Sequence, residues 1–196
     1  MLYTKKKGAA QIAGKIGEVD SKLEGDRNKV RYQQVNLARV IIAAQMQSVG
    51  ADFGIISGGG IRDSIHAGDV SYKDILKVHP FKNRITYIDI TGKDLFDYLD
   101  VVTSFPPDSG AYLQYHKLSF KRENNQLADV KINGAPIEMA KTYRMSINSY
   151  NASGGDGYPT LTKKAGFVST DDTDAQALKR YFEQNSPLKA ADYAPN

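Results

Sequence analysis

The sequence of 196 residues predicts an α+β domain in which a mixed β-sheet is packed with helices. Segments with helical spacing of apolar residues are interspersed with strand-like segments, without the strict alternation of a βαβ protein. Hydrophobic residues make up 41% of the chain and charged residues 24%, which is ordinary globular usage and supplies a core. This length suits one domain with an appended segment. We expect residues 1–16 to form a linker or hinge and residues 17–196 to form the domain.

The helices are predicted from apolar spacing and from capping residues. Residues 35–50 place Leu37, Val40 and Ile41 at helical spacing, and Gly50 provides a stop. The later helices each begin with a Ser or Thr that can cap the first turn. The predicted helices are 35–50, 71–78, 91–102 and 173–184.

The strands are predicted from short apolar runs and from alternation. "DFGII" is a continuous apolar run, whereas "RITYIDI" alternates and is rich in β-branched residues. Two further segments flank the turn "NNQ" and are expected to form a hairpin. The predicted strands are 52–56, 84–90, 118–123, 127–134 and 142–148.

Composition excludes several classes of function. The net charge of +4 and the isoelectric point near 9.0 are a mild excess, below the basic stripes of nucleic-acid-binding proteins, and fit a small anionic ligand equally well. Cysteine is absent, so no disulfide or thiolate nucleophile can form. The three histidines, His66, His79 and His116, lack metal-ligand spacing. No G-x-S-x-G elbow is present, and no apolar run reaches the 18 residues of a membrane span. The chain therefore shows no catalytic machinery of its own.

A glycine-rich segment follows the first apolar strand. In "SGGGIRDS" (57–64) the glycines allow the backbone to approach a ligand closely, and Arg62 suits bidentate contact with phosphate or ribose oxygens. The segment is neither a Walker A loop nor a clean G-x-G-x-x-G, and alone it also fits a plain turn. Arg27 and Arg31 stand four residues apart and share a helical face, which fits either anion binding or a solvated charged surface.

Two other segments carry aromatic residues next to turns. "HPFKN" (79–83) places Phe81 at a helix–strand junction, although a phenylalanine there also fits an ordinary core position. "SYNASGGDGYP" (149–159) places Tyr150 near Asp156. An aromatic ring can stack on a nucleobase. A carboxylate in a loop whose glycines give the backbone conformational freedom can accept hydrogen bonds from ribose hydroxyls. A calcium loop would need more acidic residues than the single one here.

In order and spacing, these segments resemble the C-terminal domain of the 5'-nucleotidase family. The resemblance is carried by "EGDRNKVRYQQVNLA", "SGGGIRDSI", "LKVHPFKN", "TGKDLFDYLD", "DSGAY" and "NASGGDGYP", from about Lys15 to about residue 190. It is strongest to bacterial periplasmic 5'-nucleotidases/UDP-sugar hydrolases. It implies a domain that binds the nucleotide and sets specificity in an enzyme that hydrolyses nucleoside 5'-phosphates, with UDP-sugars or NAD as further substrates.

The resemblance also implies residue roles for the nucleoside. Phe81 and Tyr150 fall on the two aromatic positions that sandwich the base. Asp156 falls on the aspartate that binds the ribose. Asn83 and Gly110 match positions that line the nucleoside pocket. Tyr150 stands where many relatives have phenylalanine, so its hydroxyl adds a polar group at the clamp.

For the phosphate, the resemblance implies that Arg62 contacts ribose and phosphate and that Arg27 and Arg31 reach toward the phosphate. In the family, two divalent metal ions are held by a covalently linked N-terminal metallophosphoesterase domain. Its motifs, D-x-H, G-N-H-[DE] and G-H-x-H, are not found in this sequence. We therefore expect this chain to bind nucleotides, to hold no cofactor and no catalytic residue of its own, and not to hydrolyse them alone. The resemblance places the protein in the periplasm or at the cell surface.

Two other functions stay open from the residues alone. A stand-alone, non-catalytic nucleotide-binding module would have the same pocket with no partner domain. An RNA- or DNA-binding domain would show steep salt dependence, and the modest charge of +4 argues against it.

Overall fold

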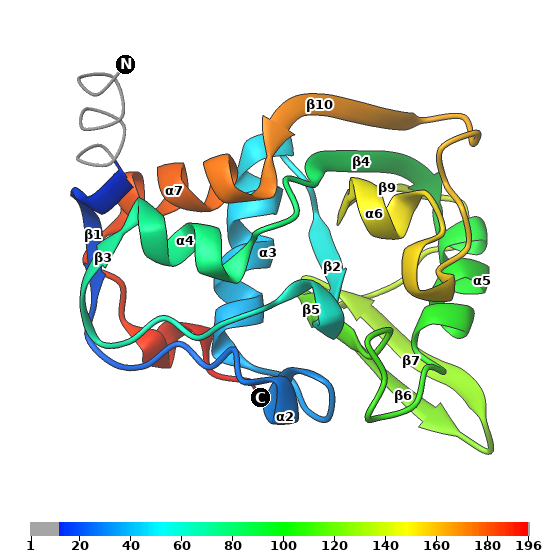
Figure 1. The fold of residues 1–196 in the computed structure, drawn as a ribbon. Coiled ribbons are helices and arrows are strands. Elements are labelled where there is room, and N and C mark those ends of the chain that lie inside the picture. The colour runs from blue at the N-terminus through cyan, green and yellow to red at the C-terminus, as the bar shows by residue number, and fades with distance from the viewer. Residues whose placement is uncertain (1–11, 196) are drawn as a thin grey trace.

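The computed structural model describes residues 12–195, in which a mixed five-stranded sheet is the central feature (Figure 1). Its strand order is β10-β4-β9-β2-β5, and only the β2–β9 pair is parallel. The predicted α+β class with a mixed sheet is confirmed. The bounds are β2 (Phe53–Ser57), β4 (Arg84–Thr91), β5 (Leu113–His116), β9 (Thr142–Asn148) and β10 (Phe167–Thr173).

Two smaller antiparallel sheets lie on either side of the central one (Figure 1). One pairs β1 (Lys15–Val19) with β3 (Gly68–Ser71). Lys15 and Ile16, expected in the linker, thus begin a strand, and residues 1–11 of that expected segment lie outside the described residues. The other contains β6 (Leu118–Glu123), β7 (Gln126–Ile132) and β8 (Ala135–Pro136).

The predicted hairpin is confirmed as β6–β7. Its turn residues Asn124 and Asn125 have φ values of 49° and 63°. This left-handed backbone is the one that tight hairpins require and that asparagine tolerates well.

The four predicted helices are confirmed, and their capping residues account for their ends. Gly50 ends α3 with φ 63°, and Ser71 with Asp74 forms a reciprocal capping box on α4. Within residues 12–195, no helix combines the length and apolar character needed to cross a membrane. Their bounds are α3 (Asn36–Val49), α4 (Tyr72–Val78), α5 (Gly92–Val102) and α7 (Asp174–Asn185), with the short helices α2 (Arg27–Val30) and α6 (Ser149–Ala152).

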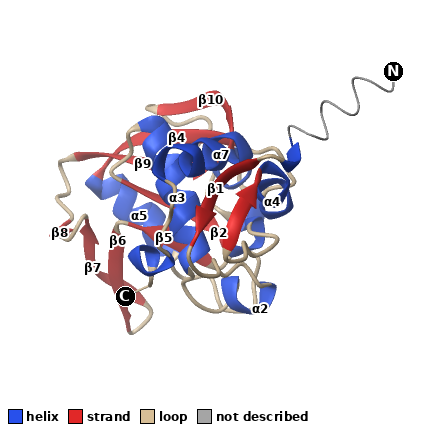
Figure 2. Ribbon diagram, turned by 90° about the vertical axis from the view of Figure 1, so that its left-hand side faces the viewer, coloured by secondary structure: helices blue, strands red, loops and turns tan. Residues whose placement is uncertain are grey.

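Both faces of the sheet are covered, as Figure 2 shows from the side. Ile56 packs in a core cluster with α3, α4 and α7, whereas Phe53 and Ile55 pack in a second cluster with α5, β7 and β9. All five residues of β2 are buried, which explains why this strand reads as a continuous apolar run.

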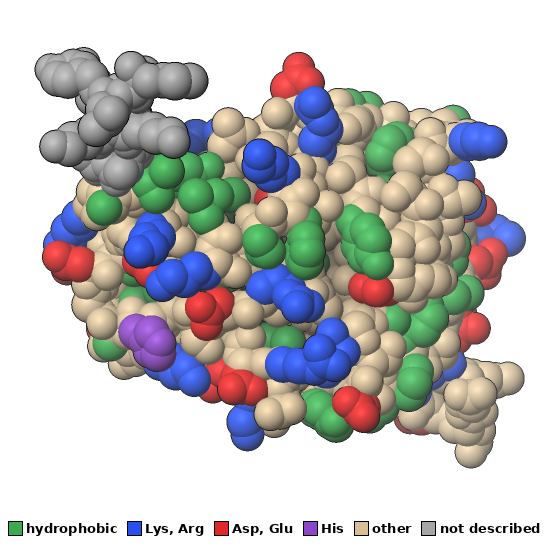
Figure 3. All heavy atoms as spheres, in the orientation of Figure 1, with side chains coloured by type: hydrophobic (Ala, Val, Ile, Leu, Met, Phe, Trp, Pro, Cys, Tyr) green, Lys and Arg blue, Asp and Glu red, His purple; other side chains and the backbone are tan. Residues whose placement is uncertain are grey.

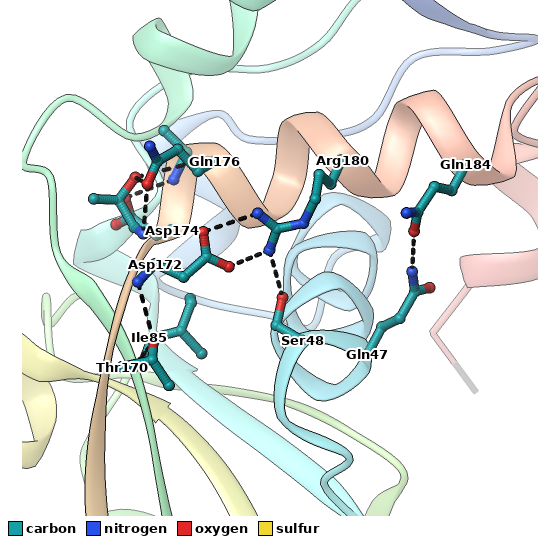
Figure 4. Close-up of polar contacts among 11 residues, drawn as sticks. Gln47, Ser48, Ile85, Thr170, Asp172, Asp174, Gln176, Arg180 and Gln184 are labelled. Atoms are coloured by element: carbon teal, nitrogen blue, oxygen red, sulfur yellow. Dashed lines mark hydrogen bonds and ion pairs between the residues drawn. The ribbon is translucent and has the colours of Figure 1, made fainter.

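A set of polar contacts fixes α7 against α3 (Figure 4). Arg180 pairs with Asp172 and donates to the Ser48 hydroxyl at 3.3 Å, and Gln47 donates to Gln184 at 2.5 Å. Thr170 donates to the Ile85 carbonyl at 2.8 Å. These contacts fix the junction between β10 and α7. Asp174, the first residue of α7, lies next to the loop that precedes β4.

Candidate functional site

Residues from five segments of the chain meet in a cavity of about 310 Å³ at one edge of the central sheet. The edge is set by topology: β2 and β9 are parallel and end there, while β4 and β5 run antiparallel to them and begin there. The volume lies at the lower end of the usual range for ligand pockets. The lining residues are Arg31, Gly59, Gly60, Arg62, Phe81, Asn83, Gly110, Tyr150 and Asp156.

Every residue that the sequence analysis proposed for the site lines this cavity except Arg27. Arg27 begins α2, whose N-cap Asp26 accepts a hydrogen bond from the Asn28 backbone. Arg31 closes the same helix and does reach the cavity. Arg27 and Arg31 therefore stand at opposite ends of α2, and only Arg31 lines the cavity.

The glycine loop is tied tightly to its neighbours. Gly58 and Gly59 donate to the carbonyls of Tyr112 and Gly110 at 2.8 and 2.9 Å. A Cβ atom on Gly58 would lie 2.2 Å from the Val30 carbonyl oxygen, so no side chain fits there without movement of the backbone. The 3₁₀ turn η1 (Gly58–Gly60) is therefore a fixed wall of the cavity rather than a flexible turn.

Asp156 has an unusual backbone and an oriented side chain. It lies in η2 (Gly155–Gly157) with φ 58° and ψ 17°, a left-handed conformation that costs free energy for a residue other than glycine. Its Oδ2 accepts a hydrogen bond from the Ser57 hydroxyl at 2.8 Å, and its Oδ1 accepts one from the Tyr150 hydroxyl at 3.1 Å. These bonds direct the carboxylate into the cavity.

Two aromatic rings are exposed at the cavity. Phe81, in the loop between α4 and β4, is 56% exposed, and Tyr150, in α6, is 45% exposed. Exposure of such large apolar rings at a concave site is a feature of ligand-binding surfaces. Burial and the neighbouring Asp156 carboxylate raise the pKa of Tyr150, so its hydroxyl stays protonated. The Tyr150 ring packs over Gly155, where an added Cβ would lie 2.6 Å from ring carbons.

The cavity also has a cationic side. The Arg62 guanidinium carbon lies 5.6 Å from the centre of the Phe81 ring, and its Nη1 donates to the Gly59 carbonyl at 3.3 Å. Among the described residues, neither Arg31 nor Arg62 forms an ion pair with a carboxylate. In the orientation of Figure 1, Figure 3 shows Lys and Arg side chains gathered between α2 and α6. Both guanidinium groups therefore keep donors for an anionic ligand.

A buried pair supports the loop that carries Phe81. His79 and Asp174 are each only 1% exposed at the side chain, and His79 Nδ1 lies 3.6 Å from Asp174 Oδ2. Burial lowers the pKa of His79 and raises the pKa of Asp174. The Asp174 backbone donates to the Asn83 carbonyl at 2.8 Å, which anchors the far end of the loop.

The described part of the chain offers no group of three or more His, Cys, Asp or Glu side chains placed to hold a metal ion. The three histidines are thus not brought together, and one of them, His79, has the buried structural position just described. The chemistry of the lining side chains suits an aromatic, hydroxylated anion, and the described residues do not fit a metal centre.

Sequence reasoning missed the residues that support Asp156. Ser57 is the last residue of β2, and Asn151 lies in α6; the Asn151 side-chain amide donates to the Ser57 hydroxyl at 3.0 Å. Both occur in the quoted motifs, next to residues that were singled out. Their places inside these motifs were the only signal, because the contact between them joins residues 94 positions apart.

A family model that covers most of the chain identifies the class of this domain. The family described as "5'-nucleotidase, C-terminal domain" matches residues 14–163, and the chain belongs to it. The family resemblance drawn from the motifs is confirmed.

Within that family the chain is similar to UshA proteins. It is 55% identical over 190 residues to "Silent protein UshA(0)" of Salmonella typhimurium, covering 97% of this chain and 34% of the relative. It is 54% identical over 189 residues to "Protein UshA" of Escherichia coli, covering 96% and 34%. The chain thus spans about a third of the length of these relatives. The crystal structure of the 5'-nucleotidase precursor from Thermus thermophilus superposes with a TM-score of 0.79 at 26% identity, covering 93% of this chain and 39% of that one.

Proposed function

We propose that this chain is the nucleotide-binding, specificity-setting domain of a 5'-nucleotidase that hydrolyses nucleoside 5'-phosphates. The observation that supports it best is the convergence, in one cavity, of two exposed aromatic rings, an oriented carboxylate and two arginines that pair with no carboxylate within residues 12–195. Each of these groups suits a different part of a nucleotide, and they come from segments far apart in the sequence.

The nucleoside would be held by the aromatic and acidic groups. Phe81 and Tyr150 offer ring faces for the base, and stacking of this kind contributes about 1–3 kcal/mol per base. Asp156 would accept hydrogen bonds from the ribose hydroxyls. Asn83 and the side-chain-free surface of Gly110 would complete the pocket wall.

The phosphate would be directed by the arginines. Arg31 and Arg62 line the cavity and supply the N–H donors, with Arg27 at the outer end of α2. Planar guanidinium groups suit phosphate oxygens because they can donate two parallel hydrogen bonds. The share of this domain in catalysis would be to position the substrate, and positioning can supply much of a rate enhancement.

Hydrolysis itself would belong to a part of the protein that this chain does not include. The described residues do not fit a metal centre, so the two divalent ions implied by the family would be held by a linked N-terminal metallophosphoesterase domain. The proposed substrates are nucleoside 5'-monophosphates, with UDP-sugars or NAD as further candidates. A periplasmic or cell-surface location is part of the proposal and is supported by the motif resemblance.

The proposal is tested by calorimetric titration of the metal-free chain with adenosine, AMP and a short oligonucleotide. We expect saturable binding of adenosine and tighter binding of AMP. Arg62→Ala should weaken AMP binding at least about tenfold, because it removes charge-assisted hydrogen bonds, and should affect adenosine less. Lys93→Ala, which removes an exposed cation on α5, is the matched control. Absence of adenosine and AMP binding at millimolar concentration, or binding of the oligonucleotide alone, would contradict the proposal.

A further inference from the structure

The hydrogen bonds of the Asp156 carboxylate leave a defined part of its acceptor capacity unused. An ionised carboxylate has two oxygens and about four acceptor sites. Ser57 occupies one site on Oδ2 and Tyr150 occupies one on Oδ1. Among the described residues, no Lys, Arg or His forms an ion pair with Asp156. One acceptor site thus remains on each oxygen, and the negative charge is not neutralised by a neighbour.

The Ser57 hydroxyl has one acceptor for its proton among its hydrogen-bond partners, the Asp156 carboxylate. Ser57 is fully buried, and its Oγ already accepts a hydrogen bond from Asn151 Nδ2 at 3.0 Å. The Ser57 backbone in turn donates to Asn151 Oδ1 at 3.2 Å, and the Asn151 backbone donates to Asn148 Oδ1 at 2.9 Å. Since a hydroxyl has a single proton, the Ser57 proton goes to Asp156. Asn151 therefore orients Ser57, and Ser57 orients Asp156.

The second hydroxyl comes from a residue that also offers its ring to the cavity. Tyr150 donates from its hydroxyl to Asp156 Oδ1 while its ring stays about half exposed. The position of the ring is therefore coupled to the orientation of the carboxylate. Phenylalanine at this position would keep the ring and lose the coupling.

We propose that the hydroxyls of Ser57 and Tyr150 are positioning groups that make Asp156 a receptor for a vicinal diol. They leave one free acceptor site on each carboxylate oxygen, which matches the two neighbouring hydroxyl donors of a ribose. This inference rests on the proposed nucleotide-binding function and specifies the sugar: a ribonucleotide is selected over a deoxyribonucleotide by a network that includes the Tyr150 hydroxyl.

The test compares adenosine with 2',3'-dideoxyadenosine, which lacks both hydroxyls, by calorimetric titration of the chain. We expect the wild-type chain to prefer adenosine. Tyr150→Phe should weaken adenosine binding by about twofold to tenfold, because the carboxylate must then be immobilised by the ligand itself. Binding of dideoxyadenosine should be weakened less than binding of adenosine, since the stacking ring is retained and this ligand has no hydroxyls for the carboxylate to bind. Ser57→Ala should reduce the same preference, and thermal melting reports whether this buried substitution is tolerated.

Tyr181→Phe is the matched control, because it removes a hydroxyl that is hydrogen-bonded to Tyr193 at 2.7 Å and that does not line the cavity. It should leave both affinities unchanged. Equal effects of Tyr150→Phe on the two ligands, or none, would overturn the positioning role of the hydroxyl. Equal wild-type affinities for the two ligands would overturn the diol receptor while leaving a nucleoside site. Failure of either nucleoside to bind would remove the proposed function and the inference with it.

Discussion

Removal of the Phe81 ring separates a binding role from a structural role. Phe81 is 56% exposed and belongs to none of the described core clusters, so Phe81→Ala leaves no cavity in the core. Its main contact within the cavity is the Arg62 guanidinium, 5.6 Å from the ring centre. An exposed cation–π contact is worth about 0.5–1 kcal/mol. The free energy of unfolding should therefore fall by about 1 kcal/mol at most.

The effect on ligand binding should be larger. If the ring stacks on the base, its loss removes about 1–3 kcal/mol of binding free energy, which corresponds to about fivefold to 150-fold in affinity. Adenosine and AMP should both be affected, because both carry the base. AMP should lose slightly more, since Arg62 also loses the ring that supports it.

Calorimetric titration with the two ligands, alongside chemical denaturation, measures both quantities. Val168→Ala is the matched control, because Val168 is an exposed apolar residue on β10 that does not line the cavity. Unchanged adenosine affinity in Phe81→Ala would refute the stacking role. A loss confined to AMP would show that Phe81 acts only through Arg62.

Three further predictions concern a small residue in the cavity, a packed glycine and a half-buried histidine. The Gly110→Ala variant should fold normally, because the added Cβ would lie at an ordinary contact distance of 3.5 Å from Asp156 Oδ1. In calorimetry it should bind adenosine about tenfold more weakly, because the added methyl group fills space beside the carboxylate. Unchanged affinity would argue against a ribose at this place. Gly58→Ala should destabilise the fold by about 1–3 kcal/mol in urea denaturation, since its Cβ would lie 2.2 Å from the Val30 carbonyl oxygen; a neutral effect would contradict the close packing. Burial, followed by nearby cations, lowers the pKa of His116 from 6.5 to about 4, so between these values the unfolded chain binds more protons and stability should fall as pH falls. His116→Gln should flatten that profile in denaturation measured from pH 7 to pH 4, and an unaltered slope would assign the loss to other groups.

The sequence predicted the elements whose signals are local. Ser71 caps α4, Thr173 caps α7, and Gly50 ends α3, each through a hydrogen bond or backbone angle that a few neighbouring residues determine. The strands β1, β3, β5, β8 and β10 were not predicted. β10 (Phe167–Thr173) is an edge strand with exposed polar residues and an irregular register after Ser169, so it lacks the alternation of a half-buried strand.

The residues of the candidate site also divide into those with a local sequence signal and those without one. Arg62, Phe81 and Asp156 were singled out because their residue types suit a nucleotide and stand next to turns, and the family resemblance then implied their roles. The hydrogen bond between Ser57 and Asn151 joins residues 94 positions apart, so no local pattern could indicate it. The position of Arg27 outside the cavity depends on how α2 packs against the glycine loop, which spacing alone does not determine.

The most direct test of the central claim is to map AMP binding on the chain by the amide chemical shifts of its NMR spectrum. We expect saturable shifts concentrated in the segments that line the cavity, around Arg31 and around residues 57–62, 79–83, 109–112 and 149–157. In Phe81→Ala, the same shifts should need about fivefold to 150-fold more AMP to reach half of their full size. Saturable shifts centred elsewhere, or no shifts at millimolar AMP, would show that this cavity is not the nucleotide site.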